Sequence, residues 1–293
     1  MRIKIILCLL LGFNLSMAYA AEVSFVVYYA KGNVTKTGSS VRLKKGDQVS
    51  RTETLLVAAQ STIILVCSNY KVIKLESKGT YGPAALQARC SAGTPGYSSS
   101  YFKYVWNEFS HTHSSPDAHP EAYMKNVGAV SRGCHDVQTA MHVDTLHLTK
   151  QHLPLVWTSS LVKPFLAVFD REVDGAPLMK FHLTQNIAFD LSELTAMLDP
   201  GEYYWQVMDS AGNGCERNYL KIWNEADYKA HVADLLKGVP VTSAAETFFV
   251  RAYILQENHF MAEALKYYKQ AVRVEPSNKL YRASLKQLYE IEN

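Results

Sequence analysis

The side chains best suited to metal chemistry lie close together in one stretch of the sequence. They are His111, His113, Asp117, His119 and His135. Imidazole and carboxylate groups are natural ligands of zinc and copper, and a His-x-His pair could present two ligands from one loop. However, the spacing matches no metalloenzyme signature, and neighbouring prolines indicate an exposed loop. We therefore interpret these histidines as solvated, and a metal-binding protein or metal-dependent hydrolase using His111, His113 and His119 is the alternative hypothesis.

Cysteine and serine give weaker catalytic signals than the histidines. None of the five cysteines forms a Cys-x-x-Cys pair, which disfavours a thiolate zinc site, and Gly-x-Ser-x-Gly is absent. Cys134 and His135 are adjacent in a chain that we expect to oxidise its thiols, which disfavours a nucleophilic cysteine. The sequence therefore predicts no catalytic residues and no cofactor, and we expect a protein that is not an enzyme.

The N-terminus predicts export. A basic start precedes an apolar run over residues 5–15, and Ala18-Tyr19-Ala20 stands where a signal peptidase would cut. The run is shorter than the ~20 residues that a membrane span needs. We expect residues 1–20 to be a signal peptide. The mature chain would begin at Ala21, have no transmembrane segment, and be periplasmic or secreted.

Removal of the signal peptide leaves four cysteines. An even number suggests two disulfides in an exported protein, and three pairings are open. We favour Cys67 with Cys90 and Cys134 with Cys215, because each pair would then lie within or beside one of the domains predicted below.

Composition and charge limit the partners. The chain of 293 residues allows two or three compact units, and with 48% apolar and 19% charged residues it is too apolar to be disordered. The net charge of +3 is small, and Lys and Arg are scattered along the sequence. Nucleic acid is therefore not expected as a partner.

Residues 21–90 are predicted to form a small β-domain, because short runs of alternating and β-branched residues are separated by turn signals. The order of these runs resembles the FecR-like periplasmic domain. A G-x-V strand at residues 32–34 is followed by "LKKGDQV" at residues 43–49, by the Ser-led strand "STIILV" and, after a turn, by "KVIKLESKGTY". The turn has Asn69-Tyr70 where that family has Asp-Gly.

The resemblance implies an interaction module of the bacterial cell envelope, without catalysis. The best-known relatives pass an outer-membrane signal through a membrane-spanning helix to a transcription regulator. We expect no such helix in this chain, so that signalling role does not transfer. The expected partners are envelope or periplasmic proteins.

Residues 91–142 are predicted to be a connector with short helices. Phe102, Trp106 and Phe109 have helical spacing, which indicates a helix lying on a neighbouring domain.

Residues 143–223 return to short strands, with turn signals every roughly 8–14 residues, as in a β-sandwich. Trp157 follows one apolar strand, and Pro200-Gly201 leads into a strand with Tyr203 and Trp205. In immunoglobulin-like sandwiches a tyrosine near the start of the penultimate strand bonds back across its corner, and a tryptophan fills the core. This segment is similar to an immunoglobulin or fibronectin type III domain.

Exposed aromatic side chains could also form a sugar-binding platform. The candidates are Tyr97, Tyr101, Tyr104, Tyr203 and Tyr204. Because tyrosines are spread along the whole chain, we favour core packing for them and keep a glycan only as a secondary alternative.

Residues 224–293 are predicted to be helical. Candidate helices span residues 225–237, 243–257, 260–274 and 278–291, and Ser243 with Glu246 forms a capping box. The second and third helices resemble a tetratricopeptide repeat unit, with large, small, aromatic and proline residues at the family's positions. These are Phe248, Ala252, Leu255, Ala264, Tyr268, Ala271 and Pro276.

The repeat resemblance implies that the alanines lie at the helix–helix contact and that partners bind elsewhere. We expect Arg251 and Gln256 on the first helix, and Asn258 in the turn, to be exposed and available to a partner. Arg251 and Glu257-Asn258 depart from the family pattern, which has Leu and a glycine turn there.

Together these patterns predict a multidomain protein, mainly β in its N-terminal and central parts, with an α-helical C-terminal tetratricopeptide-like segment. The predicted function is that of a non-enzymatic exported envelope protein, which acts as a protein-interaction or scaffold module.

Overall fold

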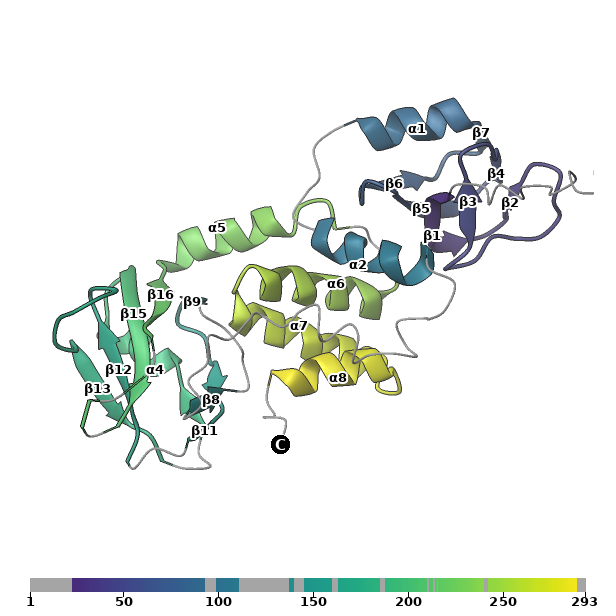
Figure 1. The fold of residues 1–293 in the computed structure, drawn as a ribbon. Coiled ribbons are helices and arrows are strands. Elements are labelled where there is room, and N and C mark those ends of the chain that lie inside the picture. Colours follow the sequence, from purple (N-terminus) through teal and green to yellow (C-terminus); the bar gives the residue numbers. More distant parts are fainter. Residues whose placement is uncertain are drawn as a thin grey trace, which may run out of the picture. The chain divides into compact units, whose positions relative to one another are not determined.

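The computed structural model describes residues 23–92, 99–110, 137–139, 145–159, 163–184, 188–209, 211–212, 214, 216–239 and 242–288. These residues form two compact units (Figure 1). The first holds the described residues up to Ser68 together with Ile73–Ser91, and the second holds Asn69–Val72 and the described residues from Ala92 on. Mainly antiparallel sheets in the N-terminal and central parts and helices in the C-terminal part agree with the predicted order of β and α structure.

Membrane-spanning structure was searched for in the same residues. None of the helices within these ranges has both the length and the apolar character to cross a bilayer.

The first unit contains two small sheets. In the four-stranded sheet the order is β3-β1-β5-β6, and in the three-stranded sheet it is β2-β4-β7. Strands β1 and β5 pair antiparallel, with Phe25 opposite Cys67. The strands are β1 (Val23–Lys31), β2 (Val34–Lys36), β3 (Gln48–Ser50), β4 (Leu55–Val57), β5 (Thr62–Cys67), β6 (Val72–Leu75) and β7 (Gly79–Tyr81).

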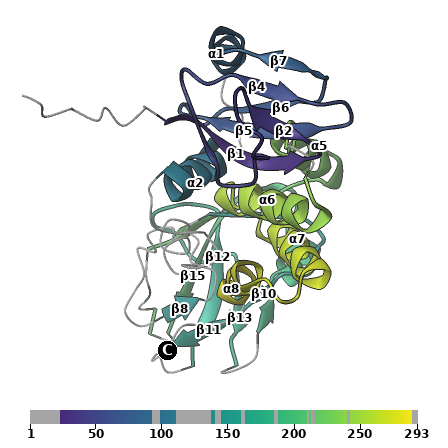
Figure 2. The same cartoon turned by 90° about the vertical axis from the view of Figure 1, so that its right-hand side faces the viewer.

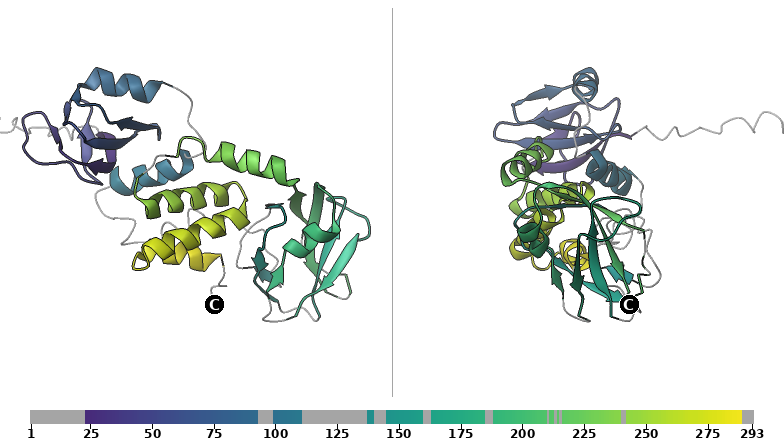
Figure 3. Two further views of the ribbon diagram at one scale, coloured as in Figure 1. Left: turned by 180° about the vertical axis from the view of Figure 1, so that it is seen from behind. Right: turned by 90° about the vertical axis from the view of Figure 1, so that its left-hand side faces the viewer.

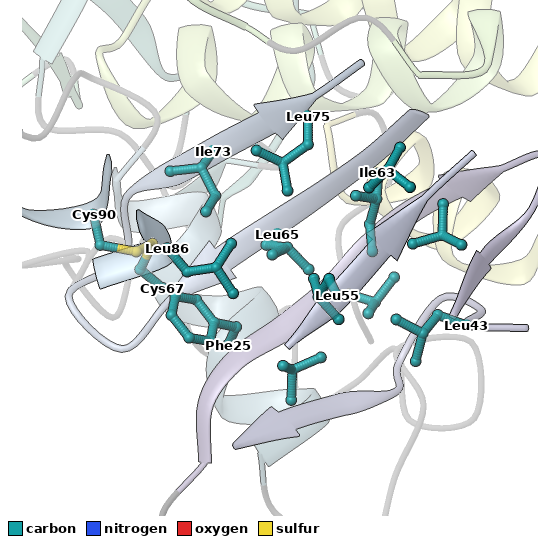
Figure 4. Close-up of a cluster of buried hydrophobic side chains, with 14 residues drawn as sticks. Phe25, Leu43, Leu55, Ile63, Leu65, Cys67, Ile73, Leu75, Leu86 and Cys90 are labelled. Carbon is teal, nitrogen blue, oxygen red and sulfur yellow. A yellow bond between two sulfur atoms is a disulfide. The ribbon is translucent and has the colours of Figure 1, made fainter. Parts of the chain in front are cut away.

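A single apolar core joins the two sheets of the first unit to helix α1 (Pro83–Ser91). Alternate residues of β5 point into it, and Ile63 and Leu65 face Leu55 from the other sheet (Figure 4). Leu86 of α1 closes the core and is fully buried. On the other face of the four-stranded sheet, Val26, Tyr28, Ile64 and Val66 are buried too, which explains why β1 and β5 read as nearly continuous apolar runs.

Gly32 and Ser61 explain why two positions of the FecR-like pattern need their residue types. Gly32 has φ +84°, and a Cβ there would lie 2.5 Å from the Oγ of Ser61. That hydroxyl accepts a hydrogen bond from the backbone N–H of Asn33 at 2.9 Å. Only glycine satisfies both the left-handed backbone and the close approach. Tyr70 has φ +64° in the turn where the family has Asp-Gly, so the same backbone conformation is formed by a less suitable residue.

The predicted disulfide between Cys67 and Cys90 is confirmed. It ties the end of β5 to α1 across a sequence separation of 23 residues. The chain-entropy model gives a loop of that size about 3 kcal/mol of stabilisation. Cys134 and Cys215 lie outside the described residues, so their pairing stays a prediction.

The β part of the second unit is built on a five-stranded sheet with the order β13-β12-β15-β16-β9. Strands β12, β13 and β15 run side by side (Figures 1 and 2). Strand β9 pairs parallel with β16, and the other pairs of this sheet are antiparallel. The strands are β9 (Thr145–Leu148), β12 (Phe165–Phe169), β13 (Met179–His182), β15 (Gly201–Met208) and β16 (Asn218–Ile222).

Two short ribbons and helix α4 accompany this sheet. Strands β10 (Pro154–Leu155) and β14 (Phe189–Asp190) form one ribbon, and β8 (Val137–Thr139) and β11 (Trp157–Ser159) form the other. Helix α4 spans Ser192–Met197.

The aromatic residues singled out in this segment pack as expected. Trp157 and Trp205 are buried, and the hydroxyl of Tyr203 donates to the backbone carbonyl of Asp199 at 3.0 Å. That bond runs back across the corner that precedes β15, and the immunoglobulin-like identity of this segment stays a prediction.

The described part of the second unit also contains five longer helices. They are α2 (Ser99–Ser110), α5 (Glu225–Leu235), α6 (Ala244–Glu257), α7 (Met261–Val274) and α8 (Lys279–Gln287). The side chains of Asn224, Ser243 and Asn278 each accept a hydrogen bond from a backbone N–H of the first turn, at the starts of α5, α6 and α8. These caps explain why the helices begin where the sequence predicts. The hydroxyl of Ser243 accepts from the N–H of Glu246, as half of the predicted capping box.

Candidate interaction site

Helix α6 lies at the centre of the helical part of the second unit. Helices α2, α6, α7 and α8 lie side by side in that order (Figures 1 and 3). Phe249 of α6 is fully buried, and its ring lies 4.7 Å from that of Tyr281 in α8 and 5.6 Å from that of Tyr268 in α7. Tyr101 of α2 packs against Tyr253 of α6 at 5.3 Å. Helix α6 is therefore buried on several sides, and only part of its surface is left for other contacts.

Small residues let α6 and α7 approach closely. Ala252, Ala264 and Ala271 are all 0% exposed, as the resemblance to a tetratricopeptide repeat implies. Phe248, in contrast, is only half-buried, because the neighbouring Phe249 fills the core instead.

The turn between α6 and α7 has no glycine, yet it adopts a glycine-like conformation. His259 has φ +64°, and its backbone N–H donates to the carbonyl of Gln256. The N–H of Phe260 reaches back to the carbonyl of Leu255 at 2.8 Å. These bonds satisfy the last carbonyl groups of α6, which explains how the chain turns without the family's glycine.

The three predicted partner contacts are half-buried rather than exposed, which corrects the expected exposure. Gln256 accepts a hydrogen bond from the hydroxyl of Tyr268 at 2.7 Å, and Asn258 donates to the carbonyl of Ile254 at 2.7 Å. Gln256 therefore bridges the two helices and Asn258 helps to end α6. Their substitution would disturb the hairpin itself.

Arg251 belongs to a surface that the sequence analysis missed. We define the α6–α7 patch as Phe248, Arg251, Lys266 and Tyr267. The rings of Phe248 and Tyr267 are stacked with centroids 6.2 Å apart, and the guanidinium carbon of Arg251 lies 5.7 Å from the Tyr267 ring. The Nζ of Lys266 lies 5.9 Å from the same ring. The sequence gives one signal for this patch, the presence of aromatic and basic residues on two adjacent helices. Whether these residues come close together depends on the register between the two helices.

A cluster of aromatic rings and imidazoles joins the helices to the five-stranded sheet within the second unit. Trp223, which follows β16, donates its indole N–H to the Nδ1 of His147 in β9 at 3.1 Å. The His147 ring stacks on Phe260 at 4.6 Å, and its backbone N–H donates to the carbonyl of His259. His231 of α5 stacks on the other aromatic members of the cluster, Trp223 and Phe260. These contacts of His147, Trp223, His231 and Phe260, which we call the joint, fix the α6–α7 turn to the sheet.

A polar contact supports the same joint. The side-chain amide of Gln151 donates to the carboxylate of Glu263 in α7 at 2.7 Å, and Glu263 is only 7% exposed. Burial, together with the charge of Glu263, raises the pKa of Tyr228 in α5. Both observations describe a packed junction rather than an acid–base pair poised for proton transfer.

Burial, together with the positive charges of His259, Lys221 and His231, lowers the pKa of His147 to about 4. Because Nδ1 accepts the indole hydrogen bond, it must carry a lone pair, and the neutral ring fits the joint. Protonation of Nδ1 would break this bond.

A cavity of about 420 Å³ lies beside the joint, between the end of α4 and the start of α5. Its lining includes Lys150, Asp199, Trp223 and Glu225. Glu225 pairs with Lys229, and this contact lowers the pKa of the carboxyl. Glu225 is therefore an anion in the first helical turn, where it complements the helix dipole, and not a general acid.

The metal hypothesis gains no support from the described part of the chain. There, no group of three or more His, Cys, Asp or Glu side chains could hold a metal ion. His111, His113, Asp117, His119 and His135 lie outside the described residues.

Comparison with known proteins leaves the function to be argued from this geometry. The sequence matches no protein-family model, and a search of curated proteins finds no relative.

The joint predicts a pH-dependent stability. The pKa of His147 is about 4 in the folded protein and about 6.5 in the unfolded chain. The neutral ring therefore contributes fully to the free energy of unfolding above about pH 6.5, and this contribution is lost as the pH falls toward about 4. After allowance for solvent screening, we expect the unfolding free energy to fall by about 1–2 kcal/mol more in the wild type than in His147→Gln over this range. Urea unfolding at several pH values measures the difference. Equal pH profiles for the two proteins would contradict this role of His147.

The small-residue contact predicts that Ala264→Leu overpacks the α6–α7 hairpin. The expected cost is on the order of 1–3 kcal/mol, because Ala264 is completely buried between the helices. Thermal unfolding of the mature chain measures it. The control is Ala230→Leu on the exposed side of α5, which should change the unfolding free energy by less than about 0.5 kcal/mol. An Ala264→Leu protein as stable as the control would reject the close packing.

Proposed function

We propose that the protein is a non-enzymatic exported envelope protein, periplasmic or secreted, that binds protein partners through its helical segment. The signal-like N-terminus, the Cys67–Cys90 disulfide and the FecR-like pattern support the compartment. The α6–α7 patch is the observation that carries the binding role.

The composition of the α6–α7 patch suits protein recognition. Tyrosine and arginine are the residues most enriched at the energetic centres of protein interfaces, where they lie against well-packed neighbours. Tyr267 stacks on Phe248, and Arg251 and Lys266 lie next to its ring. A partner would therefore meet an aromatic surface with two positive charges at its side.

Arg251 also has an unused donor. Its Nε is buried and has no hydrogen-bond partner among the described residues. A buried guanidinium N–H without an acceptor is unfavourable, so a carbonyl or carboxylate supplied by a partner would remove this penalty. Arg251 thus keeps its predicted role as a partner contact, whereas Gln256 and Asn258 hold the hairpin in shape.

Rigid support completes the case for a binding platform. Helix α7 packs along α6, and the turn that joins them is fixed to β9 through His147. A partner that binds the patch would order few additional residues, which limits the entropy lost on association. The groups with shifted pKa values at this joint, His147 and Tyr228, are engaged in packing, which supports a role without catalysis.

Affinity capture from an envelope extract tests the proposal with a matched pair of variants. Arg251 and Arg89 each lie close to a tyrosine ring, at 5.7 Å from Tyr267 and 5.5 Å from Tyr81. The mature chain should capture a defined protein, identified by mass spectrometry. Arg251→Ala should reduce the recovery of that protein by about tenfold, because an interfacial arginine contributes on the order of 1–2 kcal/mol. Arg89→Ala should leave it unchanged. Equal recovery with both variants would contradict the proposed site.

A further inference from the structure

The cavity beside the joint lies where two parallel strands end. Strands β9 and β16 form the parallel pair of the five-stranded sheet, and the backbone N–H of Trp223 extends this pairing by donating to the carbonyl of Leu148 at 2.9 Å. The residues that follow the two strands, Thr149 and Trp223, both line the cavity, and helix α5 begins at its edge. Open α/β sheets bind ligands in this position, outside the carboxyl ends of parallel strands.

A buried hydroxyl group in the wall of the cavity is available to a ligand. Thr149 is only 6% exposed, yet its hydroxyl forms no hydrogen bond within the described ranges. Thr195 of α4 also lines the cavity, but its hydroxyl already donates to the carbonyl of Ser192 at 2.8 Å. Because buried hydroxyl groups normally have a partner, Thr149 offers a donor to a group that enters the cavity.

The wall also carries one cation and one anion from different segments. Lys150 and Asp199 line the cavity, and their side chains form no hydrogen bond or ion pair in the described part of the chain. The hydroxyl of Tyr203 donates to the backbone carbonyl of Asp199, which holds that residue at the end of α4. Lys229, and to a smaller extent Lys150, lowers the pKa of Glu225 at the start of α5. The carboxylate of Glu225 is already paired with Lys229, so one positive and one negative group remain for a ligand.

Apolar side chains complete the lining. Ile222 is buried, whereas Met197 is 65% exposed and belongs to the few large apolar residues that the described chain leaves open to solvent. A methionine side chain is flexible and adapts to apolar groups of different shape. The cavity therefore provides an apolar contact next to its two charges.

The Trp223 ring argues against a sugar as the ligand. The ring of His231 stacks on it with centroids 5.2 Å apart, and the Nζ of Lys221 lies 4.3 Å from its centroid. A sugar ring binds an aromatic side chain by stacking on a free face, and these two groups already lie over the indole.

We propose that this cavity binds a free α-amino acid with an apolar side chain. Lys150 and the hydroxyl of Thr149 bind its carboxylate, Asp199 binds its ammonium group, and Met197 contacts its side chain. A compact zwitterion matches the paired charges of the wall. It also matches the volume of about 420 Å³, which is at the lower end of the about 300–1,000 Å³ of small-molecule sites. The inference goes beyond the binding of a partner at the α6–α7 patch and does not depend on it.

Calorimetric titration of the full mature chain with L-leucine, and with L-phenylalanine as a larger probe, tests the proposal. L-Leucinamide lacks the carboxylate of leucine, and 4-methylpentanoate lacks its ammonium group. Each should bind at least about tenfold more weakly than leucine, because a hydrogen bond to a charged group is lost.

Matched variants locate the binding. Lys150→Gln and Asp199→Asn should each weaken the binding of leucine by about tenfold. Lys103→Gln and Asp170→Asn, on exposed residues of the second unit outside the cavity, should change it by less than about twofold. Thr149→Val should weaken binding without lowering the melting temperature, because the hydroxyl has no partner within the described ranges.

The two leucine analogues assign each charge to its residue. Lys150→Gln should leave the affinity for leucinamide unchanged, and Asp199→Asn should leave the affinity for 4-methylpentanoate unchanged. No binding of either amino acid up to about 10 mM would overturn the inference, as would equal affinities for leucine and both analogues. Equal losses in the cavity variants and their controls would also overturn it. Arg251 is not among the residues that line the cavity, so these outcomes leave the proposed function untouched.

Discussion

A single helical hairpin cannot bury its own apolar surface, and the second unit is organised around this constraint. Helix α6 is apolar on nearly every side, so it must be covered from several directions. Helix α7 packs along it and buries Ala264, α8 contributes Tyr281, and α2 contributes Tyr101. The repeat-like pair is stable here because other helices of the same unit replace the neighbours that an array would provide.

The same constraint limits where the proposed partner could bind. The inner surfaces of α6 and α7 are used for packing, and the joint at His147 and Trp223 fixes their turn to the five-stranded sheet. The members of the α6–α7 patch are half-buried or exposed, so part of this patch stays accessible. Binding of the proposed partner at this patch would leave the core unchanged, which is the behaviour expected of a rigid interaction module.

The parts of the fold that depend on local patterns could be predicted from the sequence, and the contacts of the candidate site could not. Apolar periodicity and the cap at Ser243 predicted the helices, and the turn residues predicted the strands of the first unit, because both depend on neighbours in the chain. The disulfide of Cys67 was predicted from domain boundaries alone. The prediction that Gln256 is exposed was wrong, because its side chain bonds to the hydroxyl of Tyr268 in the next helix. The bond from Trp223 to His147 joins residues 76 positions apart, and no local pattern contains it.

Site-specific photo-crosslinking in the envelope tests the central claim most directly. A photoreactive amino acid in place of Gln270, which lies on α7 between Lys269 and Arg273, should give one discrete adduct with a protein partner. The same amino acid in place of Gln87, which is exposed on α1, should not give that adduct. The absence of any adduct from position 270, or the same adduct from both positions, would contradict the assignment of partner binding to α7.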